Sequence, residues 1–349
     1  MINVLVVDDS AFMRSALSSL ISQDPDIKIV GSARDGEDAL QKISALNPDV
    51  VTMDIEMPRM DGLATLQEIM KTAPRPVIMV SSLTEEGAEA TLKALDYGAL
   101  DFIPKSISNN HDVFASELTK KIRAVARKRA LLQLRFSRQS ATVHARRQVP
   151  SASFAPCRGA RDVVAVGVST GGPPAVQKML SALPANFPAC ILIAQHMPAA
   201  FTGPFAKRLD NVSKITVSEA QNGDKLKPGH AYVAPGGKHM MLHMRGAIPE
   251  VAITTEPASA LYKPSATVLM ESVGKTIGRK ALGVMLTGMG SDGLEGMKVL
   301  KERGGYVLAQ NEQSCVVYGM PKAVVDAGLA DQVLDIDHMA DARITAVRG

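Results

Sequence analysis

Five residues of the N-terminal third bring carboxylate, hydroxyl and amine chemistry to the ends of short apolar runs. Asp8 and Asp9 follow the run VLVV, and Asp54 follows VVTM. Ser81 follows VIMV, and Lys105 follows LDFIP. Carboxylates gathered at one sheet edge repel one another, and a hard cation such as Mg²⁺ relieves that repulsion while keeping positions open for phosphate. Because a lysine and a hydroxyl can bind phosphoryl oxygens, the pattern predicts that Asp54 accepts a phosphoryl group.

Strand-end aspartates also occur as helix caps, and Asp9 or Ser10 alone fits that role. Capping does not explain why all five residues stand at the ends of predicted strands. Ligands of an open parallel sheet bind beyond the carboxyl ends of its strands, so we expect the five side chains to face one site.

A second set of reactive residues lies in the C-terminal half of the chain. The segment GVSTG, residues 167–171, matches G-x-S-x-G, a sharp strand-to-helix turn that exposes a nucleophilic hydroxyl on Ser169. His196 comes two residues after the run ILIA, and Asp292 lies in the glycine-rich turn after LGVMLT. A serine needs a base such as histidine, and an aspartate can fix the tautomer of that base. The order Ser, His, Asp differs from the α/β-hydrolase order, so the motif does not predict that fold.

Each of these features has a simpler interpretation when taken alone. A Gly/Ser turn before a helix is common, and a strand-end histidine can be a packed polar residue. The segment GMGSDG, residues 288–293, also matches G-x-G-x-x-G, with Glu312 about 20 residues further on. Asp292 would then place a carboxylate inside a pyrophosphate loop, which disfavours nucleotide binding. His239 and His243 are spaced i, i+4 on one face of a predicted strand but lack the glutamate of H-E-x-x-H, which favours surface or pocket histidines over a metal site.

Two sets of strands must position these residues. Short β-branched runs alternate with helical patterns and predict five buried strands in the first part of the chain: Val4–Val7, Ile27–Val30, Val50–Met53, Val77–Val80 and Leu100–Ile103. Six further strands are predicted after the middle: Val163–Val168, Ile191–Ala194, Ala231–Ala234, Val251–Thr254, Leu282–Thr287 and Tyr306–Ala309. This alternation predicts an α/β protein with two doubly wound parallel-sheet domains.

The apolar periodicity fails from about Ser137 to Arg161, where Ser, Thr, Pro and Gly interrupt the chain as in an interdomain linker. We therefore expect a first domain over residues 1–122 and a second over 161–349. Between them we expect a basic linker, 123–160, which includes the end of a helix that runs from near Val113 to about Arg135.

The charge is distributed unevenly along the 349 residues. The formal net charge is +4, from 39 Lys and Arg against 35 Asp and Glu. Twelve of the cations, and no acidic residue, fall between Lys120 and Arg161, which leaves 27 cations against 35 acids elsewhere, a balance of −8. The basic middle segment, rather than a basic domain, therefore accounts for the positive total.

Composition and termini favour a cytoplasmic protein without membrane insertion. Three cysteines without C-x-x-C spacing indicate neither a disulfide framework nor a metal site. Two aspartates stand where a signal peptide would need its apolar core. The longest uncharged apolar stretch, Met179–Ala206, is interrupted by four prolines and makes a poor membrane helix.

Residues 1 to about 122 resemble a response-regulator receiver domain through the segments LVVDDS, MDIEMPRMDG, VSS and FIPKS. The resemblance implies a receiver-like five-stranded sheet, with Asp54 as phospho-acceptor and Mg²⁺ as the cofactor for phosphorylation. It places around Mg²⁺ the side chains of Asp8, Asp9 and Asp54 and the carbonyl of Glu56. It also implies a hydroxyl switch at Ser81, an aromatic switch at Phe102 and a phosphate-binding lysine at Lys105.

From about Arg161 onward the chain is similar to the catalytic domain of chemotaxis protein-glutamate methylesterases, the CheB family. The similarity lies in VGVSTGGPPAV, IAQHMP, PGHAYVAPGGKHM, LTGMGSDGLEGM and AQNEQSCVVYGMP. It implies a Rossmann-like catalytic sheet and a catalytic triad of Ser169, His196 and Asp292. Thr170 and Met289 fall where family members surround the oxyanion and the pocket.

The chain departs from the family pattern at Val168, Thr267 and Ser291, where alanine, aspartate and asparagine are frequent. These departures leave the triad intact and bear on the pocket.

The two resemblances together imply phosphorylation-activated hydrolysis of glutamyl methyl esters on methyl-accepting chemoreceptors, and deamidation of receptor glutamines. The implied partners are the chemoreceptors as substrate and a chemotaxis histidine kinase as phosphoryl donor, with no nucleic acid and no cofactor for hydrolysis. We expect the unphosphorylated receiver to cover the Ser169 pocket.

The alternatives are a DNA-binding response regulator, which the basic segment suggests, and a non-catalytic receptor adaptor. The first would need a groove-reading domain after Arg161, where the pattern predicts parallel-sheet strands. The second would be favoured by loss of a triad residue, and all three are present.

Overall fold

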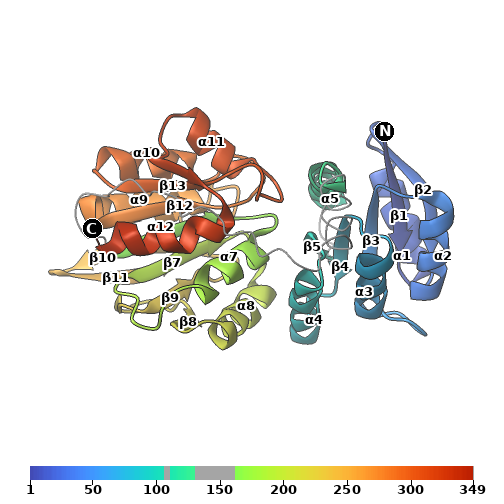
Figure 1. Ribbon diagram of the computed structural model, residues 1–349, viewed down its shortest axis with the longest axis horizontal. Coiled ribbons are helices and arrows are strands. Elements are labelled where there is room, and N and C mark those ends of the chain that lie inside the picture. The colour runs from blue at the N-terminus through green and yellow to red at the C-terminus, as the bar shows by residue number, and fades with distance from the viewer. Residues whose placement is uncertain (106–110, 130–161, 349) are drawn as a thin grey trace, which may run out of the picture. The chain divides into compact units, whose positions relative to one another are not determined.

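The structure is a computed structural model that describes residues 1–105, 111–129 and 162–348. The chain forms two compact units, Met1–Val149 and Pro150–Gly349 (Figure 1). Most of the predicted linker lies outside the described residues, so the boundaries at 122 and 161 stay predictions. Every helix in the described part is too short or too polar to cross a membrane.

The first unit is built on a five-stranded parallel sheet, as predicted. Its strands are β1 (Ile2–Val7), β2 (Ile27–Ala33), β3 (Val50–Asp54), β4 (Val77–Ser81) and β5 (Asp101–Pro104), in the order β2-β1-β3-β4-β5. The helices between and after them are α1 (Ala11–Ile21), α2 (Gly36–Leu46), α3 (Gly62–Thr72), α4 (Glu85–Asp96) and α5 (His111–Ala126). Helix α1 packs against α5, and α3 packs against α2 and α4. The strand order reverses between β1 and β3, which is where ligands of such sheets bind.

Polar side chains begin four helices of this unit. The caps of α1, α2, α3 and α4 are Ser10, Asp35, Asp61 and Thr84, and each accepts a hydrogen bond from a backbone N–H of the first turn. Ser10, and not Asp9, caps α1, which leaves the Asp9 carboxylate available to the sheet edge.

The second unit contains a seven-stranded parallel sheet in the order β14-β13-β12-β6-β7-β9-β8. Its strands are β6 (Val163–Val168), β7 (Cys190–Gln195), β8 (Thr216–Glu219), β9 (His230–Val233), β12 (Ala281–Met285), β13 (Tyr306–Gln310) and β14 (Gln332–Leu334). The chain first adds strands on one side of β6 and later on the other, so the switch point lies between β6 and β12.

Helices cover both faces of this sheet (Figure 1). They are α7 (Gly172–Ser181), α8 (Ala199–Val212), α9 (Ala266–Ile277), α10 (Leu294–Glu302), α11 (Met320–Asp326) and α12 (Ile336–Arg348), with a 3₁₀ turn, η1 (Gly278–Lys280). Helix α7 contacts α8 and α12, and α10 contacts α9 and α11. The prediction of two doubly wound parallel sheets is therefore confirmed.

A separate antiparallel hairpin differs from the predicted arrangement. Strands β10 (His239–Arg245) and β11 (Ile248–Thr254) form a two-stranded sheet of their own, so the predicted strand Val251–Thr254 is not part of the main sheet. Helix α9 contacts both β10 and the main-sheet strand β6, and its Leu269, Met270 and Val273 are fully buried. This packing fixes the start of α9 relative to the ends of the central strands.

Candidate functional site

The acidic residues of the first unit meet at the switch point of its sheet. Carboxylate oxygens of Asp8, Asp9 and Asp54 lie within 4.8 Å of one another. Lys105 Nζ lies 2.7 Å from Asp54 Oδ2 and 3.0 Å from Asp8 Oδ2. Oxygen donors in this number are the ligands that Mg²⁺ prefers, so the residues present fit a divalent cation.

The charge balance of this cluster favours cation binding. The pKa of Asp54 is raised, mainly because the side chain is buried, and the nearby Asp8 carboxylate raises it further. The Lys105 ammonium acts in the opposite direction and lowers this pKa. Burial would lower the pKa of Lys105, but its two carboxylate partners outweigh burial and raise it. One ammonium therefore faces three carboxylates, and the excess negative charge remains for a cation to neutralise.

A cavity of about 210 Å³ opens over Asp54. Its lining consists of Asp9, Asp54, Ile55, Glu56, Ser82 and Lys105. Glu56, expected to contribute its carbonyl, thus lies at the site. Ser82, which the sequence did not single out, lines the cavity.

The two predicted switch residues are buried in the neighbouring strands β4 and β5. The Ser81 hydroxyl, at the end of β4, donates to the carbonyls of Gly87 at 3.2 Å and Ser82 at 3.3 Å. It is therefore held by the start of α4 and does not line the cavity over Asp54. Phe102 in β5 is 6% exposed. Their roles as switches stay predictions.

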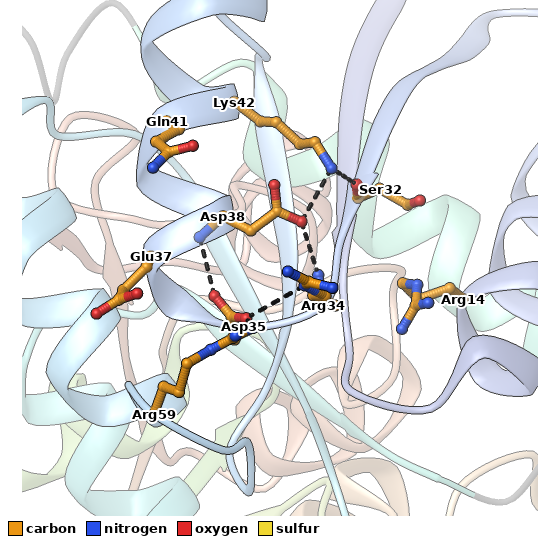
Figure 2. A pocket seen from close by; sticks show the side chains of 9 residues that line it. All are labelled: Arg14, Ser32, Arg34, Asp35, Glu37, Asp38, Gln41, Lys42 and Arg59. Carbon is orange, nitrogen blue, oxygen red and sulfur yellow. Dashed lines mark hydrogen bonds and ion pairs between the residues drawn. The ribbon is translucent and has the colours of Figure 1, made fainter.

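A larger cavity of about 440 Å³ lies beside α2, and Figure 2 shows how its charged side chains face one another. Its lining is Arg14, Ser32, Arg34, Asp35, Glu37, Asp38, Gln41, Lys42 and Arg59. Arg59 pairs with the buried Asp35 carboxylate, and Lys42 Nζ lies 2.9 Å from Asp38 Oδ2. Arg14 donates to the backbone carbonyls of Asp8 and Asp9. These contacts hold the residues after β1 and the loop after Asp54 in place.

The serine, histidine and aspartate of the second unit form a hydrogen-bonded chain at the switch point of its sheet. Ser169 follows β6, His196 follows β7 and Asp292 precedes α10. His196 Nδ1 lies 3.1 Å from Ser169 Oγ, and His196 Nε2 lies 2.8 Å from Asp292 Oδ2. Both the histidine and the aspartate side chains are about one-tenth exposed, at 9% and 10%. Because β6 lies between β7 and β12, three neighbouring strands supply the three side chains.

The hydrogen-bond partners define where the protons lie between Ser169, His196 and Asp292. Burial alone would raise the pKa of Asp292, but hydrogen bonds from His196 and from the start of α9 hold it well below its ordinary value. The ionised carboxylate accepts from His196 Nε2–H, which leaves the Nδ1 lone pair facing the Ser169 hydroxyl. The arrangement can therefore remove a proton from Ser169 Oγ.

The start of α9 holds the Asp292 carboxylate. The Ser265 hydroxyl donates to Oδ1 at 2.9 Å. The Ala266 N–H donates to Oδ2 at 2.6 Å, and the Thr267 N–H donates to Oδ1 at 3.1 Å. Thr267 Oγ1 also accepts a hydrogen bond from the Gly293 N–H at 2.7 Å. The threonine, which departs from the family pattern, thus ties the start of α9 to the residue after Asp292. A helix N-terminus favours a negative charge, so it stabilises the carboxylate.

Two side chains beside the triad were not singled out by the sequence. Tyr262 stacks on His196, with ring centroids 4.1 Å apart and planes 13° apart. Gln195 Nε2 donates to the carbonyls of Ser169 at 3.0 Å and His196 at 3.1 Å. Gln195 thus joins the turns that carry Ser169 and His196.

The turn after Ser169 and the loop after β12 supply backbone donors. Gly171 adopts φ +73°, which a residue with a Cβ rarely tolerates, and lets the chain turn into α7. The Ser169 N–H is already used by the Thr287 carbonyl. Among the described residues, the N–H groups of Thr170 and Met289 donate to no protein acceptor, so both can face an oxyanion.

The alternative motifs do not form sites of the expected kind. Asp292 in the G-x-G-x-x-G match is held by His196 and α9. His239 is fully buried and bonded to Ser265, whereas His243 is exposed. Within the described residues, the group of side chains that could hold a metal ion is Asp8, Asp9 and Asp54 of the first unit.

Comparison with known proteins identifies both units. A family model described as CheB methylesterase matches residues 164–343, and one described as response regulator receiver domain matches 4–115. A protein-glutamate methylesterase/protein-glutamine glutaminase 2 of Nitratidesulfovibrio vulgaris is 62% identical over 98% of each chain. One of Lawsonia intracellularis is 56% identical over 99% of each chain.

A solved structure extends the likeness to the fold of the second unit. The CheB methylesterase catalytic domain of Thermotoga maritima is 37% identical, with a TM-score of 0.52, and the match covers 53% of this chain and 98% of that one. The chain therefore belongs to the CheB methylesterase family and carries a response regulator receiver domain ahead of the methylesterase domain.

Proposed function

We propose that this chain hydrolyses glutamyl methyl esters on methyl-accepting chemoreceptors, with Ser169, His196 and Asp292 as its catalytic triad. The observation that carries this proposal is the continuous hydrogen-bonded chain from Ser169 Oγ through His196 to Asp292 at the switch point of the sheet. The names of the relatives supply the substrate class, since those proteins are protein-glutamate methylesterases.

The geometry supports an acyl-enzyme route. Ser169 Oγ attacks the ester carbonyl carbon while its proton passes to His196 Nδ1, and Asp292 stabilises the resulting imidazolium. The N–H groups of Thr170 and Met289 receive the oxyanion. His196 then returns its proton to the departing methoxy oxygen, which releases methanol and leaves an acyl-serine.

The same residues complete the reaction with water. His196 Nδ1 takes a proton from water as its oxygen attacks the acyl carbon, and Ser169 regains a proton as the glutamate carboxyl is released. A glutamine side chain presents the same acyl geometry with ammonia as the leaving group. The chain therefore also deamidates receptor glutamines in this proposal, as the glutaminase half of the relatives' names suggests.

Asp54 is the proposed phospho-acceptor of the receiver unit. Its buried position beside Lys105, under a cavity of about 210 Å³, supports this assignment. Asp8, Asp9, Asp54 and the Glu56 carbonyl would hold Mg²⁺, whose charge neutralises phosphoryl oxygens when it is bound. Lys105 contributes a second positive charge to the phosphoryl group. A histidine kinase of the chemotaxis system is the proposed donor.

In this proposal the unphosphorylated receiver covers the Ser169 pocket. Phosphorylation of Asp54 weakens that contact, exposes the pocket and so raises the hydrolytic activity. The cytoplasm is the proposed compartment, because the chemoreceptor glutamates and the kinase would both be met there. The DNA-binding alternative has no support, since the seven-stranded sheet and the CheB match occupy the region that a groove-reading domain would need.

Ser169→Ala tests the catalytic assignment directly. The substitution removes the nucleophile and leaves the backbone donors, so methanol release from methylated receptor membranes is expected to fall by at least about 10⁴-fold. Ser181→Ala, in the exposed last turn of α7, is a matched control and is expected to keep full activity. Substantial methanol release by Ser169→Ala would refute the triad.

A further inference from the structure

His239, the first residue of β10, is a buried titratable group that the catalytic scheme does not use. Its side chain is fully buried, although β10 extends into a hairpin whose far end is exposed. His239 Nδ1 accepts a hydrogen bond from the Ser265 backbone N–H at 3.2 Å. A ring nitrogen that accepts a hydrogen bond carries no proton, so this contact requires the neutral imidazole with its proton on Nε2.

The surroundings keep His239 neutral. Burial is the largest cause that lowers the pKa of His239, and Lys263 acts in the same direction. The Pro257 carbonyl and the carboxylates of Asp292 and Glu256 act against them, and the net direction is downward. The acceptor at Nδ1 is therefore available at neutral pH.

Ser265 connects His239 to the catalytic aspartate. Its N–H is held by His239, and its hydroxyl donates to Asp292 Oδ1 at 2.9 Å. The same hydroxyl caps α9 by accepting from the Val268 N–H at 3.3 Å. The next two N–H groups of α9 also donate to Asp292. The placement of Ser265 thus governs three of the four hydrogen bonds that Asp292 receives.

We propose that His239 is a positioning residue for the triad, which holds Ser265 so that the start of α9 orients the Asp292 carboxylate toward His196. This inference rests on the proposed function of the triad. Without an acceptor at Nδ1, the Ser265 N–H would be buried and unpaired, and the serine would move to find another partner. A displacement of about 1 Å transmitted to a catalytic group costs on the order of 10²-fold in rate.

Two variants of equal shape separate hydrogen bonding from packing. The side chains of Asn and Leu have nearly the same size and branched shape. Only the Asn side chain of His239→Asn keeps a hydrogen-bond acceptor near the position of Nδ1. We expect His239→Leu to lower kcat for methanol release on the order of 10- to 100-fold with KM changed less than about threefold, and His239→Asn to recover most of the loss. Wild-type kcat in His239→Leu, or equal losses in both variants, would overturn the proposal.

Ser265→Ala provides an independent test that does not alter His239. It is expected to lower kcat about tenfold or more, and the double variant His239→Leu/Ser265→Ala is expected to lose less than the product of the single effects, because both act through Asp292. If His239→Leu fails to fold, an unchanged kcat in Ser265→Ala still overturns the proposal.

Proton NMR of the intact chain adds a readout that needs no substrate. The low-field proton shared by His196 Nε2 and Asp292 is expected to persist in His239→Asn and to shift or broaden in His239→Leu. An unshifted proton in His239→Leu would contradict the proposed positioning role. Ser169→Ala is assayed in parallel: its continued activity would defeat the proposed function itself, whereas its inactivity leaves the His239 test to stand alone.

Discussion

Asp292 receives hydrogen bonds from His196, from the Ser265 hydroxyl and from two backbone N–H groups at the start of α9. These donors keep the carboxylate ionised and fix its direction. In the proposed mechanism, an ionised and oriented carboxylate stabilises the imidazolium that forms when His196 takes the serine proton. In that mechanism the activity of Ser169 therefore depends on groups that never touch the substrate.

Replacing Asp292 with Asn tests that dependence. The amide cannot provide a negative charge and can donate to His196 Nε2, which favours the wrong tautomer. We expect kcat for methanol release to fall on the order of 10⁴-fold, measured by steady-state kinetics. Asp326→Asn, which removes only an exposed carboxylate paired with Lys322, is the control and should retain wild-type kcat. A loss of less than tenfold in Asp292→Asn would contradict the role of the carboxylate.

The same residue predicts how stability depends on pH. Its pKa in the folded protein lies below the ordinary value of 3.8, so ionised Asp292 contributes stability that is fully present above that pH. The contribution is lost as the pH falls below 3.8 toward the folded-state pKa. Denaturant unfolding of the wild type and Asp292→Asn should therefore give a stability difference that is constant near neutral pH and shrinks below about pH 4. A difference that grew on acidification would contradict the assignment.

The sequence predicted that side chains at the ends of parallel strands lie close together, and the structure brings Ser169, His196 and Asp292 into contact. Ser169, His196 and Asp292 each follow a run of buried residues, and parallel strands bring such ends together. Ser265 and Tyr262 were missed because they come from the segment before α9 and reach the triad only through tertiary packing. A capping serine before the apolar helix was the one sequence signal for Ser265. Stacking of Tyr262 on His196 has no sequence signature.

At the scale of elements, β-branched runs predicted all the central strands, because strands buried on both faces are apolar along their length. The edge strands β8 and β14 were missed, since they have four and three residues and are partly exposed. Strand β11 and the strand around His239 and His243 were both predicted, but their separate pairing was not, because alternation alone does not say which sheet a strand joins. That hairpin matters for the site, since β10 carries His239 and packs against α9.

The junction of β3 and α3 gives an element-scale prediction. A methyl group on Gly62 would lie 2.0 Å from the Asp54 carbonyl oxygen and 2.9 Å from Ile55 Cα, so the helix start and the strand end must separate. We expect Gly62→Ala to slow Mg²⁺-dependent phosphorylation by a small acyl phosphate on the order of 10- to 100-fold. Gly203→Ala in α8 is the control, because its nearest neighbour is Glu219 Oε2 at 3.7 Å. Equal phosphorylation rates in both variants would show that the close approach is dispensable.

At the scale of the whole molecule, the positive net charge comes from a basic segment whose described part forms ion pairs within the first unit. Three of the basic residues that follow Lys120 pair with carboxylates of their own unit: Lys121 with Asp101, Arg123 with Asp24, and Arg129 with Asp49. These pairs attach α5 and the residues after it to the receiver. Part of the basic segment thus forms ion pairs within its own unit. The basic residues from 130 to 161 lie outside the described residues.

A phosphoryl group on Asp54 is proposed to control hydrolysis at Ser169. The most direct measurement is the rate of methanol release from methylated receptor membranes, with and without a small acyl phosphate and Mg²⁺, for the wild type and Asp54→Asn. Stimulation of the wild type is expected, together with an unstimulated but measurable rate for Asp54→Asn, whose triad is intact. Equal stimulation of both proteins, or of neither, would contradict control of the methylesterase unit through Asp54.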